Sequence, residues 1–162
     1  MRKLNLGCGT HWLPSKDGWD NIDVRDLVPP STARFIKHDV RRIRKDLYLD
    51  GTIDEIFASD ILEHMPKPHA LIFLEDMVAL LKKGGKITIR TPEFSYIMEW
   101  SKKHTTEEIR YRCYGWNDYP ENSHCFVWLE HELLAVCDKL GLSVVTRART
   151  EETNMTLSLL KR

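Results

Sequence analysis

Hydrophobic positions in this chain recur with two different periods, and the switch between them marks out the expected secondary structure. Short apolar runs, or apolar residues at every second position, predict strands. Apolar residues three and four positions apart predict helices. The strand pattern occurs over residues 3–7, 20–24, 34–40, 53–60, 85–92, 142–149 and 154–161, and the helix pattern over 69–85, 105–115 and 131–141.

Start and stop signals support the three expected helices. Pro68 suits the first turn of the first helix, because proline has a helical φ angle and no N–H to leave unpaired. Thr105 suits the capping position of the second helix. Glycines follow all three patterns, at Gly84, Gly115 and Gly141, and are expected to end the helices.

The order of these elements predicts the fold. Strand, crossover and strand alternate through residues 3–92, which favours a parallel sheet covered by helices. The last two strands are joined only by TEETN, residues 150–154, which is too short for a parallel crossover and right for an antiparallel hairpin. The predicted fold is therefore α/β: a Rossmann-like, seven-stranded, mostly parallel sheet with a C-terminal antiparallel hairpin and helices on both faces.

Composition indicates a single globular domain over residues 1–162. Hydrophobic residues make up 42% of the chain and charged residues 30%, and no linker or repeat divides it. The 24 basic side chains equal the 24 acidic ones, so net charge gives no reason to expect nucleic acid or a membrane surface as a partner. Short apolar runs and an immediate first strand lead us to expect no membrane span, no signal peptide and a cytoplasmic location.

The cysteines are expected to be reduced and free of metal. No two of them form a C-x-x-C pair, which disfavours both a disulfide framework and a structural zinc site. The alternative is a zinc site that joins the C-terminal cysteines to His124 and His131, but zinc ligands usually come in close pairs. The four cysteines are Cys8, Cys113, Cys125 and Cys137.

Candidate chemistry begins at the first turn, LGCG, which comprises Leu6, Gly7, Cys8 and Gly9. Its two glycines let the backbone approach a ligand closely, because they have no side chain in the way. The turn is not the dinucleotide fingerprint, since Trp12 stands where the third glycine would, and it lacks the lysine of a phosphate loop. A turn needed only for packing is the alternative.

The segment between this turn and the second strand is too short and too interrupted for a full helix. It spans residues 10–18 and contains Pro14 and Gly18. Folds that bind dinucleotides place a helix N-terminus against the pyrophosphate at this point. The missing helix therefore argues against NAD and favours a ligand without phosphates.

Acidic residues follow three successive strands, at the edge of the sheet where ligands bind in such folds. Asp23 ends the second strand and can accept both hydroxyls of a ribose. Asp39, beside the backbone of Val40, can accept the amine of an adenine. Ser59 and Asp60 follow the fourth strand. Each acid alone could be a surface residue, but together they predict a site for an adenosine that bears no phosphates.

Six motifs occur in a recognisable order: LNLGCG, GWDNIDV, HDV, IDEIFASDILEHM, LLKKGGKITIRTP and LGLSVV. In them the chain resembles the class I S-adenosylmethionine-dependent methyltransferases, and most closely a compact group with a GW-NID motif in place of a full first helix. The likeness is good over residues 3–92 and loose over 133–162. It implies a methyltransferase that uses S-adenosyl-L-methionine, and it leaves the acceptor open as a small molecule, a sugar or a glycan.

The resemblance also implies which residues bind the cofactor. Gly7 and Gly9 would flank its methionine part, and Asp23 would hold its ribose. The loop over residues 10–18 would cover it, with His11 or Trp12 as a lid. The full implied set is Leu6, Gly7, Cys8, Gly9, Asp23, Val24, Asp39, Val40, Ser59 and Asp60.

A hydroxyl or amine acceptor needs a base to take its proton, and the candidates are Asp60, His64 and His124. For His64 the alternative is a packing role in the loop before the next helix. The irregular segment over residues 111–128 is expected to help build the acceptor site, or else to be a surface loop pinned by buried rings. The rings considered for the acceptor over residues 91–128 are Tyr96, Trp100, Tyr114, Trp116, Tyr119 and His124.

A second class of function remains open from the sequence. A non-catalytic module, such as a regulatory subunit that binds S-adenosylmethionine or a nucleoside, would keep the same glycine turn and acids. Formation of S-adenosylhomocysteine would distinguish an enzyme from such a module. The sequence does not predict the oligomeric state.

Overall fold

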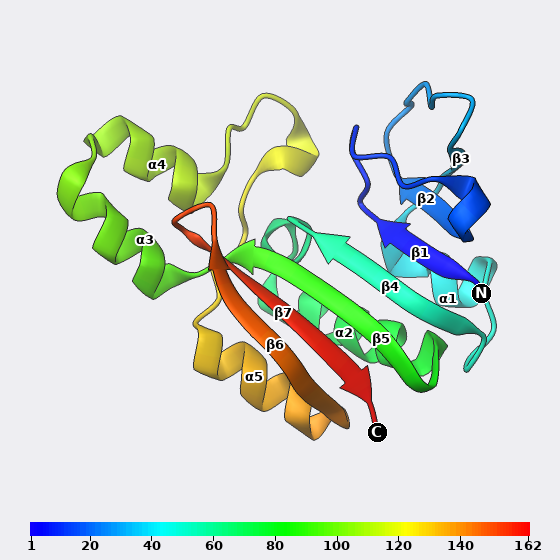
Figure 1. The fold of residues 1–162 in the computed structure, drawn as a ribbon. Helices are drawn as coiled ribbons and strands as arrows, with labels where there is room; N and C mark the ends of the chain where they lie inside the picture. Colours follow the sequence, from blue (N-terminus) through cyan, green and yellow to red (C-terminus); the bar gives the residue numbers. More distant parts are fainter.

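Seven strands form one sheet in the computed structural model, which describes residues 1–162 apart from the side chain of Pro120 (Figure 1). Across the sheet the strands follow the order β3-β2-β1-β4-β5-β7-β6. β1 to β5 pair in parallel, and β7 runs antiparallel to both β5 and β6. Their bounds are β1 Lys3–Leu6, β2 Trp19–Asp23, β3 Arg34–Lys37, β4 Ile53–Ser59, β5 Leu81–Pro92, β6 Leu142–Thr150 and β7 Asn154–Lys161.

The expected seven-stranded sheet and its C-terminal hairpin are therefore confirmed.

The α-helices are α1 Ile43–Asp46, α2 Lys67–Leu80, α3 Phe94–Trp100, α4 Thr106–Tyr114 and α5 Glu130–Lys139. Short 3₁₀ turns connect them: η1 Ser15–Asp17, η2 Val40–Arg42, η3 Leu62–His64, η4 Ser101–Lys103 and η5 Pro120–Asn122.

Two predicted boundaries were wrong. The helix expected over 69–85 ends at Leu80, because Leu81 already pairs with Ile53 as the first residue of β5. Gly84, with a φ of 73°, lies inside that strand, beside an irregularity in its register with β4. The third strand ends at Lys37 rather than at residue 40. Asp39 instead begins the η2 turn, where its side chain accepts a hydrogen bond from the N–H of Arg41.

The second predicted helix has the expected cap. The hydroxyl of Thr105 accepts from the N–H of Glu108, and the carboxylate of Glu108 accepts from the N–H of Thr105 at 2.8 Å. This reciprocal pair satisfies two N–H groups that the start of a helix leaves without partners. Pro68 lies in the first turn of α2, as predicted.

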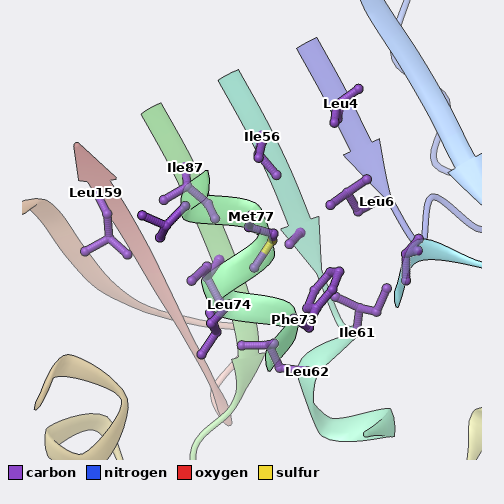
Figure 2. Packing of buried hydrophobic residues seen from close by; sticks show 14 of the residues in the cluster. Leu4, Leu6, Ile56, Ile61, Leu62, Phe73, Leu74, Met77, Ile87 and Leu159 are labelled. Atoms are coloured by element: carbon purple, nitrogen blue, oxygen red, sulfur yellow. The ribbon is translucent and has the colours of Figure 1, made fainter. Parts of the chain in front are cut away.

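Packing between α2 and the sheet forms the centre of the core. Phe73, Leu74 and Met77 of α2 lie against Ile56 of β4 and Ile87 of β5 (Figure 2). Together with the other buried side chains they form one hydrophobic cluster that extends to β7 and α5. Burial of this apolar area is the main force that holds the sheet and α2 together.

The helices are distributed unevenly around the sheet. In Figure 1, α1 and α2 lie behind it, whereas α3 and α4 extend beyond the carboxyl end of β5. The opposite face of β1, β4 and β5 carries polar side chains. The carboxylate of Glu55 there forms ion pairs with Lys3 at 3.0 Å and Lys86 at 3.6 Å. None of the helices in the described residues has the length and apolarity that a bilayer crossing requires.

A pair of buried asparagines holds the loop that stands in place of the first helix. The side-chain amide of Asn21, in β2, accepts from the N–H of Leu13 and donates to its carbonyl, both at 2.9 Å. Asn5, in β1, donates to the carbonyl of His11 at 2.7 Å and to the amide oxygen of Asn21 at 2.8 Å. Buried backbone groups need partners, and in this loop an asparagine side chain provides what a helix would supply internally.

We expect Asn21→Ala to lower the free energy of unfolding by about 2–4 kcal/mol, because it leaves several buried donors and acceptors without partners. Urea denaturation would measure the change. The exposed Ser143→Ala in β6 should change stability by less than about 0.5 kcal/mol. A loss below about 1 kcal/mol for Asn21→Ala would show that the loop does not depend on this amide.

Candidate active site

The candidate site is a cavity of about 830 Å³ at the carboxyl ends of β1, β2 and β4. β1 lies between β2 and β4, so the chain leaves β1 in one direction across the sheet and later returns to its other side. The connections that follow strands at such a point diverge and leave a crevice between them. The predicted residues that line the cavity are Gly7, Cys8, Gly9, Asp23, Val24, Asp39, Val40, Ser59, Asp60 and His64.

The glycine turn after β1 forms the floor of the cavity. Gly7 and Gly9 have φ angles of 63° and 52°, in the left-handed region that glycine occupies without strain. A Cβ atom on Gly7 would lie 2.5 Å from Cδ1 of Ile61, so a larger residue would be strained at this φ and would push the Ile61 side chain aside. Cys8 between them is buried, and this burial raises the pKa of its thiol to about 12.

Asp23 is already saturated with hydrogen bonds. Its Oδ2 accepts from the N–H of Gly9 at 2.9 Å, and Arg25 donates to both oxygens through its backbone N–H, Nε and Nη2. Burial alone would raise the pKa of Asp23, but the hydrogen bonds from Arg25 and Gly9 outweigh it and lower the pKa. The carboxylate therefore stays ionised and fixed at the end of β2.

The other two strand-end acids also have their own arginines. Arg41 donates to both oxygens of Asp39 through Nε, and these bonds lower the pKa of that carboxyl. Asp60, with a φ of 51°, accepts from Nε of Arg90 at 2.9 Å and from the amide of Asn154 at 2.9 Å. All three acids that the sequence singled out are thus paired in the free protein.

Arg25 also connects the two sides of the cavity. Its Nη1 donates to the hydroxyl of Tyr119 at 3.1 Å, and its guanidinium lies 5.0 Å from the centre of that ring. Tyr119, Glu121 and Asn122 come from the segment after α4 and also line the cavity. This segment, the yellow loop of Figure 1, turns back toward the ends of β1 and β4.

His64 and His124 meet near the same side of the cavity. Their rings are 5.0 Å apart at 71°, and Nδ1 of His64 lies 3.1 Å from the carbonyl of Ser123. Burial lowers the pKa of both imidazoles, to about 4 for His124, where the neighbouring His64 adds to the effect. Beside them, burial raises the pKa of Glu63 to about 8. Both rings are therefore neutral at neutral pH.

Not every predicted residue reaches the cavity. Leu6 lies in the hydrophobic core, so only its backbone adjoins the glycine turn. His124 packs behind His64 and is not among the lining residues. Of the aromatic rings considered for the acceptor, Tyr119 alone lines the cavity among the described side chains, and Trp116 is 68% exposed and stacks on Tyr111.

Sequence reasoning missed the basic partners of the acids. Arg25 and Arg41 each stand two residues after an acid, a spacing visible in the sequence. Arg90 is thirty residues from Asp60 and adjoins it only through the pairing of β4 with β5. Of the two possible lids, His11 lines the cavity, whereas Trp12 packs against Phe35.

A family model described as a methyltransferase domain matches residues 1–147. The chain belongs to this family. It is an S-adenosylmethionine-dependent methyltransferase of the class I superfamily. Among curated protein sequences, none matches this chain.

Solved structures share the fold of this methyltransferase at low sequence identity. A protein from Pyrococcus horikoshii is 15% identical with a TM-score of 0.72, over 99% of this chain and 82% of its own. A SAM-dependent methyltransferase from Archaeoglobus fulgidus is 14% identical with a TM-score of 0.70, over 99% and 86%. A Burkholderia thailandensis 1,6-didemethyltoxoflavin N1-methyltransferase, crystallised with its acceptor and S-adenosylhomocysteine, is 15% identical with a TM-score of 0.66, over 98% and 70%.

The paired state of Asp23 leads to a prediction about cofactor affinity. If the ribose hydroxyls bind Asp23, they compete with Arg25 for the same oxygens. Asp23→Ala should therefore weaken S-adenosylhomocysteine binding by about 1.5–3 kcal/mol, whereas Arg25→Ala should tighten it by several-fold. Calorimetry on the two variants would measure both changes. Unchanged affinity in Asp23→Ala would place the ribose elsewhere, and weaker binding in Arg25→Ala would show that the guanidinium supports the cofactor.

The cysteines should differ sharply in reactivity. All four are free, and Cys125 is exposed whereas Cys8 and Cys137 are buried. The pKa of both buried thiols is raised to about 12 by burial, so their thiolate fraction at pH 8 is very small. We expect iodoacetamide to label Cys125 first and Cys8 only slowly. The rate of Cys8 labelling should rise about tenfold for each unit of pH while the protein stays folded. Mass spectrometry of the peptides would reveal any rapid labelling of Cys8.

Proposed function

We propose that this methyltransferase acts on a small-molecule, sugar or glycan acceptor that enters the cavity beside His64. The observation that carries the proposal is one continuous cavity with two chemically different ends. Its volume of about 830 Å³ lies in the upper part of the range for ligand pockets, roughly 300–1,000 Å³. A cavity of this size has room for the cofactor and a small acceptor together.

The end near β1, β2 and η2 suits an adenosine with a methionine tail. Gly7 and Gly9 leave the backbone open toward the methionine part, and Asp23 would take the ribose hydroxyls. Asp39 and Val40 would lie beside the adenine. This donor set contains no group arranged for a phosphate, which agrees with the absence of an α-helix over residues 10–18 in the described backbone. The residues present therefore fit S-adenosylmethionine.

When bound, the cofactor supplies a methyl group on a positively charged sulfur that leaves readily. Alignment of the acceptor is then the main contribution required of the protein. At the second end of the cavity, Tyr119, Glu121 and Asn122 offer polar groups and one aromatic face to an acceptor. These features are typical of sites for sugars and other polar small molecules.

His64 is the group that we assign to proton removal from the acceptor. Its Nδ1 faces the carbonyl of Ser123, which can only accept, so this nitrogen carries the hydrogen. Nε2 then holds a lone pair that can take a proton. Asp60 is less suited to this task, because Arg90, Ser59 and Asn154 all donate to its carboxylate. We propose that Asp60 contributes a negative charge to the site, and that His124 holds the His64 ring in position by packing against it.

The charge of the lining favours an uncharged acceptor. Five carboxylates and three arginines line the cavity, and the excess of negative charge complements a cationic cofactor. The same excess disfavours a phosphate-rich acceptor, because nucleic acids bind where positive charge gathers. A neutral sugar or heteroaromatic compound is the class of acceptor that this lining supports.

Replacing His64 should separate binding from catalysis. We expect His64→Ala to leave S-adenosylhomocysteine affinity nearly unchanged and to lower methyl transfer by ~10²–10⁴-fold, the usual effect of losing a general base. The assay would follow S-adenosylhomocysteine formation with a panel of sugars, nucleotide sugars and heteroaromatic hydroxyl compounds. The matched control is His69→Ala, which removes an exposed histidine of α2 and should change neither property.

The outcomes of this assay are distinct. A wild-type protein that binds S-adenosylhomocysteine but turns over no member of the panel would contradict the proposed acceptor class. Full activity per folded molecule in His64→Ala would remove His64 from the chemistry. Melting temperatures of the variants would show whether a loss of rate reflects unfolding instead.

A further inference from the structure

Three metal-binding side chains meet beside the cavity. Glu63 and His64 are neighbours in η3, and His124 comes from the segment after α4. Each offers one ligand atom, and these atoms all lie within 4.8 Å of one another. The two segments are joined at this point, because the N–H groups of Cys125 and Phe126 both donate to the carbonyl of Glu63, at 2.6 and 3.2 Å.

Both imidazoles are oriented in the way that metal-binding histidines usually are. Nδ1 of His64 lies 3.1 Å from the carbonyl of Ser123, and Nδ1 of His124 lies 3.2 Å from the carbonyl of Arg112. A carbonyl only accepts, so each Nδ1 carries the hydrogen and each Nε2 keeps its lone pair. Metal ligands are commonly held by such a hydrogen bond from the second ring nitrogen, which fixes both tautomer and orientation.

Glu63 is a buried acid without a cationic side chain bonded to it. It is 1% exposed, and its Oε2 accepts from the hydroxyl of Thr91 at 2.9 Å. Among the described side chains, no lysine or arginine donates to this carboxylate. An acid buried in this way is costly to ionise unless a cation lies beside it. A metal ion between Glu63 and the two histidines would supply that cation.

We infer that Glu63, His64 and His124 form a binding site for one divalent transition-metal ion such as zinc. Two imidazoles and one carboxylate are a donor set that zinc and ferrous iron share. Bonds of about 2.1 Å at tetrahedral angles place two ligand atoms ~3.4 Å apart, so atoms that now lie up to 4.8 Å apart have to close by up to about 1.4 Å. This site is not the cysteine site considered from the sequence, because it uses none of the four thiols.

An ion there would leave at least one coordination position to a non-protein ligand. Three protein ligands are typical of catalytic rather than structural zinc. Of the three side chains, His64 lines the cavity, so the ion would lie next to the space that we propose for the acceptor. If the proposed function is right, the ion rather than the His64 imidazole would favour loss of the acceptor proton. This last step rests on the proposed function, whereas ion binding itself does not.

The test is ion binding by the protein without cofactor or acceptor. Chelator-treated protein would be dialysed against Zn²⁺ or Co²⁺ and measured by elemental analysis, titration calorimetry and the visible spectrum of the cobalt form. We expect one equivalent for the wild type and at least about tenfold weaker binding for both His124→Ala and Glu63→Gln. Glu63→Gln keeps the size of the side chain and its bond to Thr91, which protects against simple unfolding.

Controls make each result decisive. His69→Ala and His131→Ala remove exposed histidines and should leave the stoichiometry unchanged. The proposal would be contradicted if the wild type bound no stoichiometric ion. It would also be contradicted if His124→Ala and Glu63→Gln bound the ion as tightly as the wild type. A cobalt form whose spectrum contains a sulfur-to-cobalt absorption band, lost in Cys113→Ser or Cys125→Ser, would also contradict the proposal, because it would show that cysteines bind the ion. S-adenosylhomocysteine affinity, measured on the same samples, reports separately on the methyltransferase function.

Discussion

The side-chain amide of Asn21 is the contact on which the glycine-turn side of the cavity depends. A loop that replaces a helix has backbone N–H and C=O groups with no internal partners, and such groups are costly to bury. Asn21 bonds to both polar groups of Leu13, and Asn5 holds the carbonyl of His11. Because both asparagines lie in central strands, the loop takes its position directly from the sheet. The glycine turn and His11 are thereby held in the lining of the cavity without an α-helix.

Ionic pairing is the second constraint on the site. Asp23, Asp39 and Asp60 each have an arginine bonded to them, so the free protein contains no isolated carboxylate at these three strand ends. This arrangement holds the three carboxylates in fixed positions, and a ligand that used the same oxygens would have to displace a bonded guanidinium. Glu63 differs from these three aspartates in two ways. It is more deeply buried, and within the described residues no basic side chain is bonded to it.

Alternation and turn chemistry made the sheet predictable from sequence. The strand ends at Asp23 and Ser59 were predicted to within one residue, because the short runs DNIDV and IDEIFASD close there on acidic residues. The end of α2 was not, because Leu81 extends the helical stripe and only its pairing with Ile53 assigns it to β5. α3 was missed for a related reason: its start depends on the side chain of Glu93, which accepts from the N–H of Tyr96.

The site was predictable where it depends on local sequence and unpredictable where it depends on packing. The glycine turn and the three acids lie at, or within two residues of, the ends of strands, so their spacing revealed them. Neither the contact of His64 with His124 nor the bond from Arg90 to Asp60 has any local signal, because the partners are distant in the chain. Two asparagines inside apolar strands were a visible signal for the loop contacts, since a polar residue at a buried strand position requires a partner.

The bond between Arg25 and Tyr119 has a consequence for the order of events in turnover. Arg25 holds Asp23 on one side of the cavity and the segment after α4 on the other. If the ribose takes Asp23, the guanidinium leaves, and the same movement releases the segment after α4, which lines the cavity where we propose that the acceptor binds. The first substrate would then open the way for the second, and the protein would follow a compulsory sequence of binding with the cofactor ahead of the acceptor.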